Sequence, residues 1–415
     1  MVQERKFLKG PRLRDIDGYD FPGFQKALEM GPEAIVEEIS KSGLLGRGGA
    51  GFPTGKKWEL AYQEEGEEKY IICNADEGEP GTFKDRYLLD ERTLKVLEGM
   101  MIGAYTIDAD TGYIYIRGEY SRQIEILEEI LQEAREAGVL GEDILGSNFS
   151  FDIKLVRGAG CYVCGDETSL LNSLEGMRGS SRSKPPYPIS KGLYGCPTLV
   201  NNVETLACSA EILNQGAEKF ASMGTEESSG TKLVSLSGDI NFPGVYEVEF
   251  GSASLQGIIE DLGGGSQQGQ EIKFIIPGGL STPIVPSDNL QAEYSYEGLQ
   301  QAGSNVGSGG MMVVGTAREL SDILTRIARF YMDESCGTCL PCREGNKQIY
   351  KIISEAKYAG LTVNRLNLVQ DIGDTMQEAA RCGLGRSAQL PIGTILSEYK
   401  EELIEGEIYH DKSHR

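Results

Sequence analysis

Histidine is almost absent from this chain of 415 residues, which contains only His410 and His414, both in the polar C-terminal tail. Serine-histidine-aspartate triads, zinc sites with histidine ligands and histidine general bases all depend on the imidazole ring. These classes of site are therefore nearly excluded before any motif is considered.

Positive charge and long hydrophobic runs are also scarce. The 63 acidic residues outnumber the 40 basic ones, for a net charge of −23, which argues against binding nucleic acid or an anionic lipid surface. No apolar run reaches transmembrane length, and residues 1–22 lack the apolar core of a signal peptide. We therefore expect a cytoplasmic protein without direct membrane insertion, which still allows a peripheral place in a membrane complex.

Cysteine is infrequent, and the odd count of nine does not suggest a disulfide scaffold. Cys336, Cys339 and Cys342 form a C-x2-C-x2-C motif, and Cys382 follows forty positions later. Four such thiolates suit a [4Fe–4S] cluster, although four cysteines also suit tetrahedral zinc. Because a zinc ribbon normally uses two separated C-x2-C pairs, the overlapping pairs favour iron–sulfur.

A second C-x2-C pair, Cys161 and Cys164, lies in a glycine-rich turn between a predicted strand and a predicted helix. Such a pair can be a redox-active dithiol. Since no partner pair lies nearby in the sequence, we favour the interpretation that these cysteines are unliganded packing residues.

The hydrophobic pattern indicates an α/β protein with several units. Helical spacing over 22–43 precedes strands that alternate with helices up to about residue 174, which is typical of a largely parallel sheet. A β-β-α-β order over 232–276 suits a ubiquitin-like α+β unit, and helical spacing from 317 onward predicts a helical bundle. The expected domains are 1–54 (helices and glycine loop), 55–222 (Rossmann-like α/β), 223–316 (ubiquitin-like, β-grasp) and 317–415 (helical bundle).

Glycine is abundant, with 54 residues, and one glycine-rich loop stands out. Gly46 to Gly51 satisfies G-x-G-x-x-G, but the preceding segment is predicted to be helical, so an ordinary Rossmann dinucleotide site is doubtful. Glycines still let backbone N–H groups approach a phosphate or a ring, and Arg47 and Lys57 add positive charge.

Two further loops follow predicted strands, at the sheet edge where open α/β proteins bind ligands. The acidic loop over 74–81 contains Asp76, Glu77 and Glu79, which suit hydrogen bonds to ribose hydroxyls or to a flavin, or a solvated turn. In the loop over 160–168, Asp166 and Thr168 are equally suited to capping the next helix.

Together these residues resemble the NADH-oxidising, NADH-binding flavoprotein (the F subunit) of bacterial respiratory complex I (NADH:quinone oxidoreductase), over nearly the whole chain. The resemblance rests on four motifs: Gly46-Arg-Gly-Gly-Ala-Gly-Phe-Pro-Thr-Gly55, Asn74-Ala-Asp-Glu-Gly-Glu-Pro-Gly-Thr-Phe-Lys-Asp-Arg86, Gly195-Cys-Pro-Thr-Leu-Val-Asn-Asn-Val-Glu-Thr205 and Glu334-Ser-Cys-Gly-Thr-Cys-Leu-Pro-Cys-Arg-Glu-Gly345.

The resemblance implies three sets of site residues. FMN would be held by Gly46, Arg47, Gly48, Lys57, Asn74, Asp76, Gly165, Asp166, Asn201, Asn202 and Thr205. NADH would lie along Phe52, Glu79, Tyr162, Glu167, Lys184 and Tyr187, with Phe52 and Tyr187 near the adenine. A [4Fe–4S] cluster would be ligated by Cys336, Cys339, Cys342 and Cys382.

The implied reaction is hydride transfer from NADH to FMN, followed by one-electron transfer to the cluster; no protein acid or base is needed, so the lack of histidine is no obstacle. Glu79 and Glu167 would disfavour the extra phosphate of NADPH. Similar chains usually carry two glutamates where this one has Asp166-Glu167.

The implied partners are a small [2Fe–2S] subunit and further complex I subunits, at the inner face of the cell membrane. Two alternatives stay open from the residues: a diaphorase subunit of an NAD-linked hydrogenase or formate dehydrogenase, and a non-redox zinc-stapled binding protein.

Overall fold

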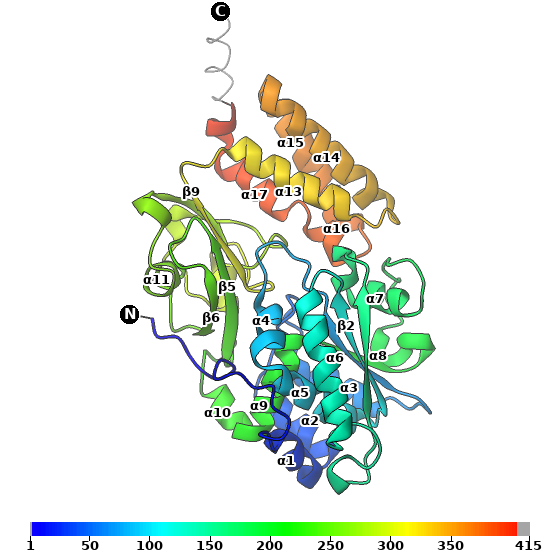
Figure 1. Cartoon of the computed structure of the whole chain (residues 1–415). Coiled ribbons are helices and arrows are strands. Elements are labelled where there is room, and N and C mark those ends of the chain that lie inside the picture. The colour runs from blue at the N-terminus through cyan, green and yellow to red at the C-terminus, as the bar shows by residue number, and fades with distance from the viewer. Residues whose placement is uncertain (1, 405–415) are drawn as a thin grey trace, which may run out of the picture.

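The computed structural model describes residues 2–404, apart from the side chains of residues 358 and 359, so His410 and His414 lie outside it. Helices surround two separate sheets, and a group of helices forms the C-terminal end (Figure 1). The strands are β1 (Tyr70–Ala75), β2 (Thr111–Arg117), β3 (Asp152–Gly158), β4 (Thr198–Asn202), β5 (Thr231–Gly238), β6 (Gly244–Glu249), β7 (Ile272–Ile276), β8 (Val285–Pro286) and β9 (Gly310–Gly315). The helices before β5 are α1 (Pro22–Met30), α2 (Pro32–Lys41), α3 (Thr54–Gln63), α4 (Lys84–Glu91), α5 (Thr93–Ile107), α6 (Ser121–Glu136), α7 (Glu167–Leu174), α8 (Pro188–Lys191), α9 (Val203–Gln215) and α10 (Ala217–Ala221). Those after β6 are α11 (Leu255–Gly257), α12 (Tyr296–Gln301), α13 (Leu320–Glu334), α14 (Leu340–Ala359), α15 (Val363–Ala379), α16 (Gly383–Ser387) and α17 (Leu390–Glu398).

The first sheet has four parallel strands in the order β3-β2-β1-β4, which confirms the predicted parallel α/β unit. Successive side chains of a strand point to opposite faces. In β1, Ile71 and Cys73 enter the core formed with α5, α6 and α9, whereas Ile72 enters a second core on the side of α7. Because both faces are buried, the first four residues of β1 form a continuous apolar run rather than an alternating one.

Two buried helices of this unit, α5 and α9, were not predicted. They pack against each other so closely that a Cβ atom added to Gly99 would lie 2.1 Å from the carbonyl oxygen of Leu206. Almost every residue of α5 is buried, including Lys95, whose ammonium group pairs with Glu98 and with Glu211 of α9. A helix that is buried all around lacks the one-sided apolar stripe on which helix prediction depends.

The second sheet has the order β6-β5-β9-β7-β8, with β5 antiparallel to β6 and parallel to β9. This arrangement agrees with the predicted ubiquitin-like unit, although β9 itself was missed. Met311 and Val313 of β9 pack on the unit's own core, while Met312 and Val314 pack toward the C-terminal helices. Burial on both faces again removes the alternation that would have identified the strand.

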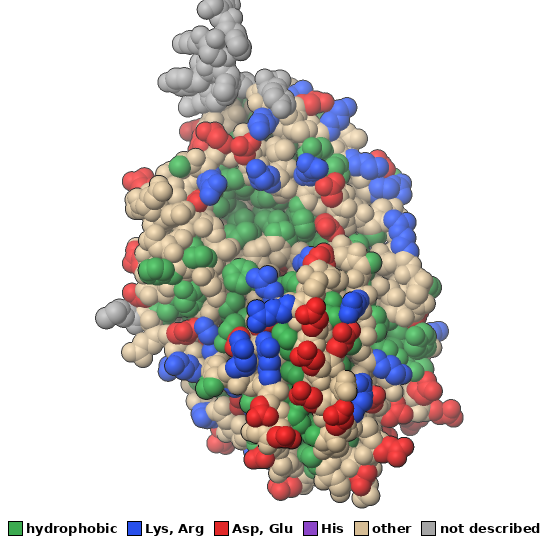
Figure 2. Space-filling model, viewed as in Figure 1, with side chains coloured by type: hydrophobic (Ala, Val, Ile, Leu, Met, Phe, Trp, Pro, Cys, Tyr) green, Lys and Arg blue, Asp and Glu red, His purple; other side chains and the backbone are tan. Residues whose placement is uncertain are grey.

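The C-terminal helices α13 to α17 confirm the predicted bundle, and among residues 2–404 none of the helices is both long and apolar enough to cross a membrane. One continuous core joins this bundle to the outer face of the second sheet and to α7 beside the first sheet. Figure 2 shows a hollow lined by hydrophobic side chains just below these helices, with Lys and Arg side chains gathered beneath it. Basic residues thus concentrate locally on an acidic protein.

Candidate functional site

The glycine loop lies between α2 and α3. Its ends are joined by a hydrogen bond from the N–H of Gly46 to the carbonyl of Phe52 (2.9 Å), and Gly49 and Gly51 have positive φ angles of 122° and 64°. Within residues 2–404, the backbone N–H groups of residues 48–51 donate no hydrogen bond. Free N–H groups on a loop with left-handed residues form a concave anion site, so the loop is suited to a phosphate.

The loop presses against the carboxyl end of the parallel sheet. A Cβ atom added to Gly48 would lie only 3.0 Å from the Cβ of Asn202, and the N–H of Arg47 donates to the hydroxyl of Thr205 (2.9 Å). Glycine at position 48 is therefore required by the approach of the loop to β4. The glycine loop thus meets the carboxyl end of the strands, although the loop itself does not follow a strand.

The side chain of Arg47 does not contribute its charge to an open cleft, contrary to the expectation from the sequence. Its guanidinium group is fully buried, donates to the carbonyl of Ser229 (2.8 Å) and lies 4.9 Å from the centre of the Phe250 ring. Arg47 therefore connects the loop to the second sheet, and only its backbone faces the first sheet. The sequence could not distinguish an inward from an outward guanidinium.

At the end of β1, the predicted residues Asn74 and Asp76 meet the loop before α7. The amide of Asn74 donates to the carbonyl of Gly165 (2.8 Å), and its side-chain oxygen accepts from the N–H of Asp76 (3.2 Å). Burial raises the pKa of Asp76 to about 7, with Arg117 acting in the opposite direction. Two loops that lie ninety residues apart in the sequence are thus held together at one sheet edge.

Asp166 and Glu167 have different environments although they are adjacent. Asp166 caps α7, since one of its carboxylate oxygens accepts from the backbone N–H groups of Thr168 and Ser169 (both 3.1 Å). Glu167 instead forms ion pairs with Lys57 (3.2 Å) and Lys184 (2.6 Å), which hold the pKa of Glu167 low even though burial opposes this. The structure therefore brings Lys57, Glu167 and Lys184 into one charged cluster with a net charge of +1.

The three acidic residues of the loop over 74–81 are not equivalent. Glu77 is buried and accepts hydrogen bonds from the backbone N–H groups of Asp85 (2.8 Å) and Arg86 (3.0 Å), so it caps α4. Glu79 instead accepts from the N–H of Ser281 (2.8 Å), in a loop of the ubiquitin-like unit. The solvated-turn interpretation is therefore wrong for Glu77 and Glu79.

Tyr162 connects the same region to the C-terminal helices. Its backbone N–H donates to the carboxylate of Glu334 (2.8 Å) and its ring lies 5.2 Å from that of Phe330, both at the end of α13.

Phe52 and Tyr187 remain 49% and 57% exposed, which leaves both rings accessible for stacking.

A buried ion network beneath the cleft was not identified from the sequence. Lys84 pairs with Asp85 (2.6 Å) and Glu204 (3.1 Å), and Glu204 also pairs with Lys232 of β5. The amide of Asn202 donates to Asp85 (2.6 Å), while the side chain of Asn201 accepts from the indole of Trp58 (3.0 Å). Lys84, Asp85 and Glu204 lie inside the motifs of the resemblance, and this was the only available signal.

Three of the four predicted ligand cysteines lie at two helix N-termini, and Cys336 lies in the segment between α13 and α14. Cys339 precedes α14, Cys342 lies in its first turn and Cys382 precedes α16. A Cβ added to Gly385 of α16 would lie 3.3 Å from the sulfur of Cys342. Burial, with smaller contributions from the neighbouring thiols of Cys339, Cys382 and Cys336, raises the pKa of Cys342 to about 11, while a hydrogen bond with Ser335 acts in the opposite direction.

This donor set fits an iron–sulfur cluster, because four clustered thiols need a cationic group before they can all ionise. Within residues 2–404, no three cysteine, histidine, aspartate or glutamate side chains are already arranged to hold a single metal ion.

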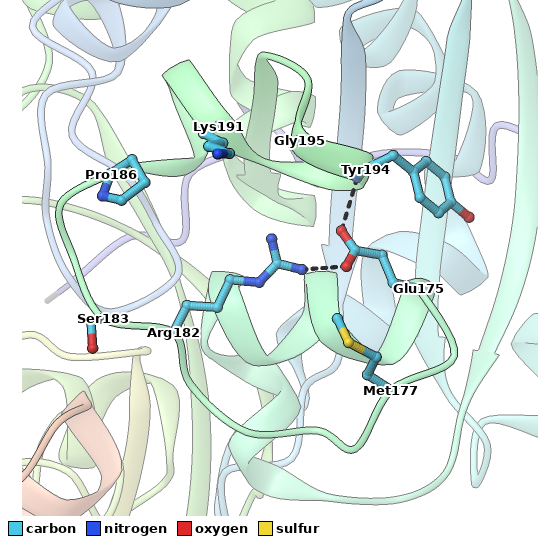
Figure 3. A pocket seen from close by; sticks show the side chains of 8 residues that line it. All are labelled: Glu175, Met177, Arg182, Ser183, Pro186, Lys191, Tyr194 and Gly195. Carbon is cyan, nitrogen blue, oxygen red and sulfur yellow. Dashed lines mark hydrogen bonds and ion pairs between the residues drawn. The ribbon is translucent and has the colours of Figure 1, made fainter.

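A separate pocket of about 510 Å³ adjoins the segment that carries Lys184 and Tyr187 but contains none of the predicted site residues (Figure 3). Arg182 and Glu175 form an ion pair in it (2.8 Å), and the N–H of Tyr194 donates to Glu175 (2.8 Å). These contacts fold the segment over 175–195 against α7. The ion pair and the hydrogen bond at this pocket therefore hold the segment that carries Lys184 beside the charged cluster.

Two family models match the chain. Residues 39–210 match the Nuo51 FMN-binding domain, and residues 322–406 match the NADH-ubiquinone oxidoreductase-F iron-sulfur binding region. The first match includes the glycine loop and the strand ends, and the second includes all four clustered cysteines. The cofactors are therefore FMN and a [4Fe–4S] cluster, and the zinc-stapled alternative is not supported.

Relatives match over nearly the full length. The chain is 42% identical to the NADH-quinone oxidoreductase F subunit 2 of Rhizobium meliloti over 93% of this chain and 92% of the relative, and 42% identical to the NADH-quinone oxidoreductase F subunit of Streptomyces coelicolor over 93% and 85%. It is also 42% identical to the HndC subunit of the NADP-reducing hydrogenase of Solidesulfovibrio fructosivorans, over 93% and 78%.

Among solved structures, a chain of an NAD+-reducing [NiFe]-hydrogenase in the H2-reduced state superposes with a TM-score of 0.85 at 34% identity, covering 97% of this chain and 67% of that one. The fold, the two matched cofactor-binding regions and the sequence identity over nearly the whole chain all indicate the same family. The chain belongs to the family of NADH-quinone oxidoreductase F subunits, the NADH-oxidising flavoproteins through which electrons enter complex I.

Proposed function

We propose that this chain binds FMN between the glycine loop and the carboxyl end of the parallel sheet, and that NADH is oxidised there. FMN, when bound, accepts a hydride from NADH and releases the two electrons one at a time to the iron–sulfur cluster. The free N–H groups of residues 48–51 would hold the phosphate, and Asn74, Asp76, Asn201 and Asn202 at the strand ends would face the flavin.

The chain's own groups would then bind and orient the dinucleotide. The ion pairs of Glu167 with Lys57 and Lys184 fix this carboxylate beside the cleft, where it can accept hydrogen bonds from ribose hydroxyls. Glu79 is held by the loop at Ser281, so the ubiquitin-like unit positions one wall of the nucleotide path. Phe52 and Tyr187 provide exposed rings for the adenine.

The observation that carries the proposal is the position of the loop over 161–167. It contacts the end of β1 through the bond between Asn74 and Gly165, and it contacts the end of α13, two residues before Cys336, through the bond between Tyr162 and Glu334. A short path from a flavin to a cluster on Cys336, Cys339, Cys342 and Cys382 is what one-electron transfer requires.

We further propose that a small [2Fe–2S] subunit binds this chain, and that the assembly lies at the inner face of the cell membrane with other complex I subunits. Full-length identity to the F subunits of NADH-quinone oxidoreductases supports this assignment. The similarity to hydrogenase subunits favours a second candidate, the diaphorase of an NAD-linked hydrogenase. Copurification from native membranes distinguishes the two, since quinone-reducing partners support the first and hydrogenase subunits the second.

An anaerobic NADH titration of the purified holoprotein tests the activity. The flavin absorbance should bleach with about one NADH per FMN, and a low-temperature EPR signal of a reduced cluster should then develop. Absorbance that does not respond to NADH, or zinc in place of iron on metal analysis, would overturn the proposal.

A further inference from the structure

Cys161 and Cys164 have no role in the function described above. Cys161 is the residue just before the short 3-10 helix η2 (Tyr162–Gly165), and Cys164 lies within it. The N–H of Cys164 donates to the carbonyl of Cys161 (2.9 Å), so one turn brings the two residues together. Both are free thiols, and each directly affects the ionisation of the other. A pair three residues apart on one turn is close enough for a disulfide after a small side-chain rotation.

The two thiols differ in accessibility. Cys161 is partly exposed, whereas Cys164 is only 4% exposed and lies so close to Gly179 that a Cβ there would be 2.5 Å from its sulfur. A hydrogen bond from the Cys164 thiol lowers the pKa of Cys161 to about 7, while the same bond and burial raise the pKa of Cys164. The carboxylates of Glu334 and Asp76 and the phenol of Tyr115 face the pair, and the effect of Glu334 on the pKa of Cys161 opposes that hydrogen bond.

An accessible, easily ionised thiol beside a buried partner is the arrangement of an attacking and a resolving cysteine. We propose that Cys161 and Cys164 form a redox-active dithiol that small-molecule disulfides, such as glutathione disulfide, convert reversibly into an internal disulfide. This inference does not rest on the function proposed for the nucleotide cleft.

The exchange balances in two steps. The Cys161 thiolate attacks one sulfur of the small disulfide, forms a mixed disulfide and releases one thiolate. The Cys164 thiol then loses its proton and attacks the sulfur of Cys161, which forms the internal disulfide and releases the second thiolate. Two electrons pass from the protein dithiol to the reagent, which leaves as two thiols.

Oxidation of the pair would affect the turn η2, which contacts two other regions of the protein. η2 carries Tyr162, which binds Glu334, and Gly165, which binds Asn74, and it leads directly into Asp166 and Glu167. A disulfide across η2 would fix the turn between the strand ends and the C-terminal helices. The dithiol is thus placed to report the thiol redox state at the junction of these two regions.

The test is a redox titration of the holoprotein under anaerobic conditions, in buffers of reduced and oxidised glutathione. After acid quenching, free thiols are alkylated and the peptides are identified by mass spectrometry. A disulfide joining Cys161 to Cys164 should appear in a single two-electron transition and disappear when reduced glutathione is restored. The proposal would be overturned if both thiols can still be alkylated at the highest ratio of oxidised to reduced glutathione, or if Cys161 pairs with another cysteine.

Two variants test the order of attack. Cys164→Ser should trap glutathione on Cys161, whereas Cys161→Ser should leave Cys164 unmodified because it is buried. Cys196→Ser, at a partly exposed cysteine outside the pair, should behave as the wild type. If Cys164→Ser does not fold, the wild-type titration and Cys161→Ser still decide, because glutathione found on Cys164 in the latter would contradict the assigned roles.

Discussion

The proposed nucleotide cleft and the cysteine site are built in opposite ways. The cleft gathers five chain segments around residues 46–52, 57, 74–79, 165–167 and 201–205, and much of it is backbone held by a buried ion network. The cysteine site takes three of its four thiols from seven consecutive residues and the fourth from the N-terminus of α16. The cleft therefore depends on tertiary structure throughout, whereas the cysteine site depends mainly on local spacing.

This difference indicates how each region should respond to mutation. A thiol that ligates the cluster has no substitute, so its loss should abolish that centre while the flavin remains. In the cleft, many contacts share the binding of one cofactor, so single changes should have graded effects. Mutations in the buried ion network beneath the cleft should have larger effects than mutations of the residues that line it, because an unpaired charge in the network cannot reach water.

The largest effect is expected at the cysteine site. Cys382→Ser should abolish or replace the EPR signal of the reduced cluster, because a serine hydroxyl is a poor ligand for iron–sulfur centres, while FMN stays bound. The measurements are EPR at low temperature, iron content and flavin content, with Cys196→Ser as the control. An EPR signal identical to that of the wild type would remove Cys382 from the ligand set.

Next in size is the network beneath the cleft. Glu204→Gln leaves Lys84 and Lys232 without a common carboxylate in the protein interior and should lower the free energy of unfolding by about 3–5 kcal/mol. Denaturant unfolding measures the change. Glu37→Gln removes an exposed ion pair with Lys41 and should leave stability unchanged. Equal effects of the two variants would show that the network does not support the cleft.

A smaller effect is expected at Asp76, and it depends on pH. Since burial raises its pKa to about 7, the folded state binds the proton more tightly than the unfolded chain, whose carboxyl group titrates near 4. The stability from the protonated form is present below pH 4 and is lost as the pH rises to 7. Asp76→Asn should therefore raise the free energy of unfolding by no more than about 4 kcal/mol at pH 8 and leave it unchanged at pH 4.

Thermal unfolding at both pH values checks this prediction. The exposed Asp110→Asn variant is the control, and its stability should match that of the wild type at both pH values. A stability gain of Asp76→Asn over the wild type that is larger at pH 4 than at pH 8 would contradict the prediction.

The smallest effect concerns the cleft lining. Glu167→Gln leaves Lys57 and Lys184 without their shared carboxylate and raises the charge of the cluster from +1 to +2. NADPH should then be used better relative to NADH by about tenfold, because its extra phosphate meets two unpaired ammonium groups. Comparison of kcat/KM for the two nucleotides measures this. An unchanged ratio would show that Glu167 does not determine the preference.

Residue patterns along the chain were enough to predict much of the architecture and the grouping of the four cysteines. Alternation of strands and helices predicted the parallel sheet, and the C-x2-C-x2-C spacing predicted a metal because neighbouring thiols on one turn must share an environment. The helices α5 and α9 and the strand β9 escaped prediction, since segments buried on every side have no polar face to set their period.

The environment of each charged residue, in contrast, is known only from the folded structure. Asp76, Glu77 and Glu79 look alike in the sequence, yet one is a half-buried carboxyl with a raised pKa, one caps α4 and one is held by the second sheet. Arg47 was expected to add positive charge to the glycine loop, and its guanidinium group instead lies buried against Phe250. The role of a charge depends on the desolvation and the partners that distant segments bring to it, and residue spacing along the chain does not contain that information.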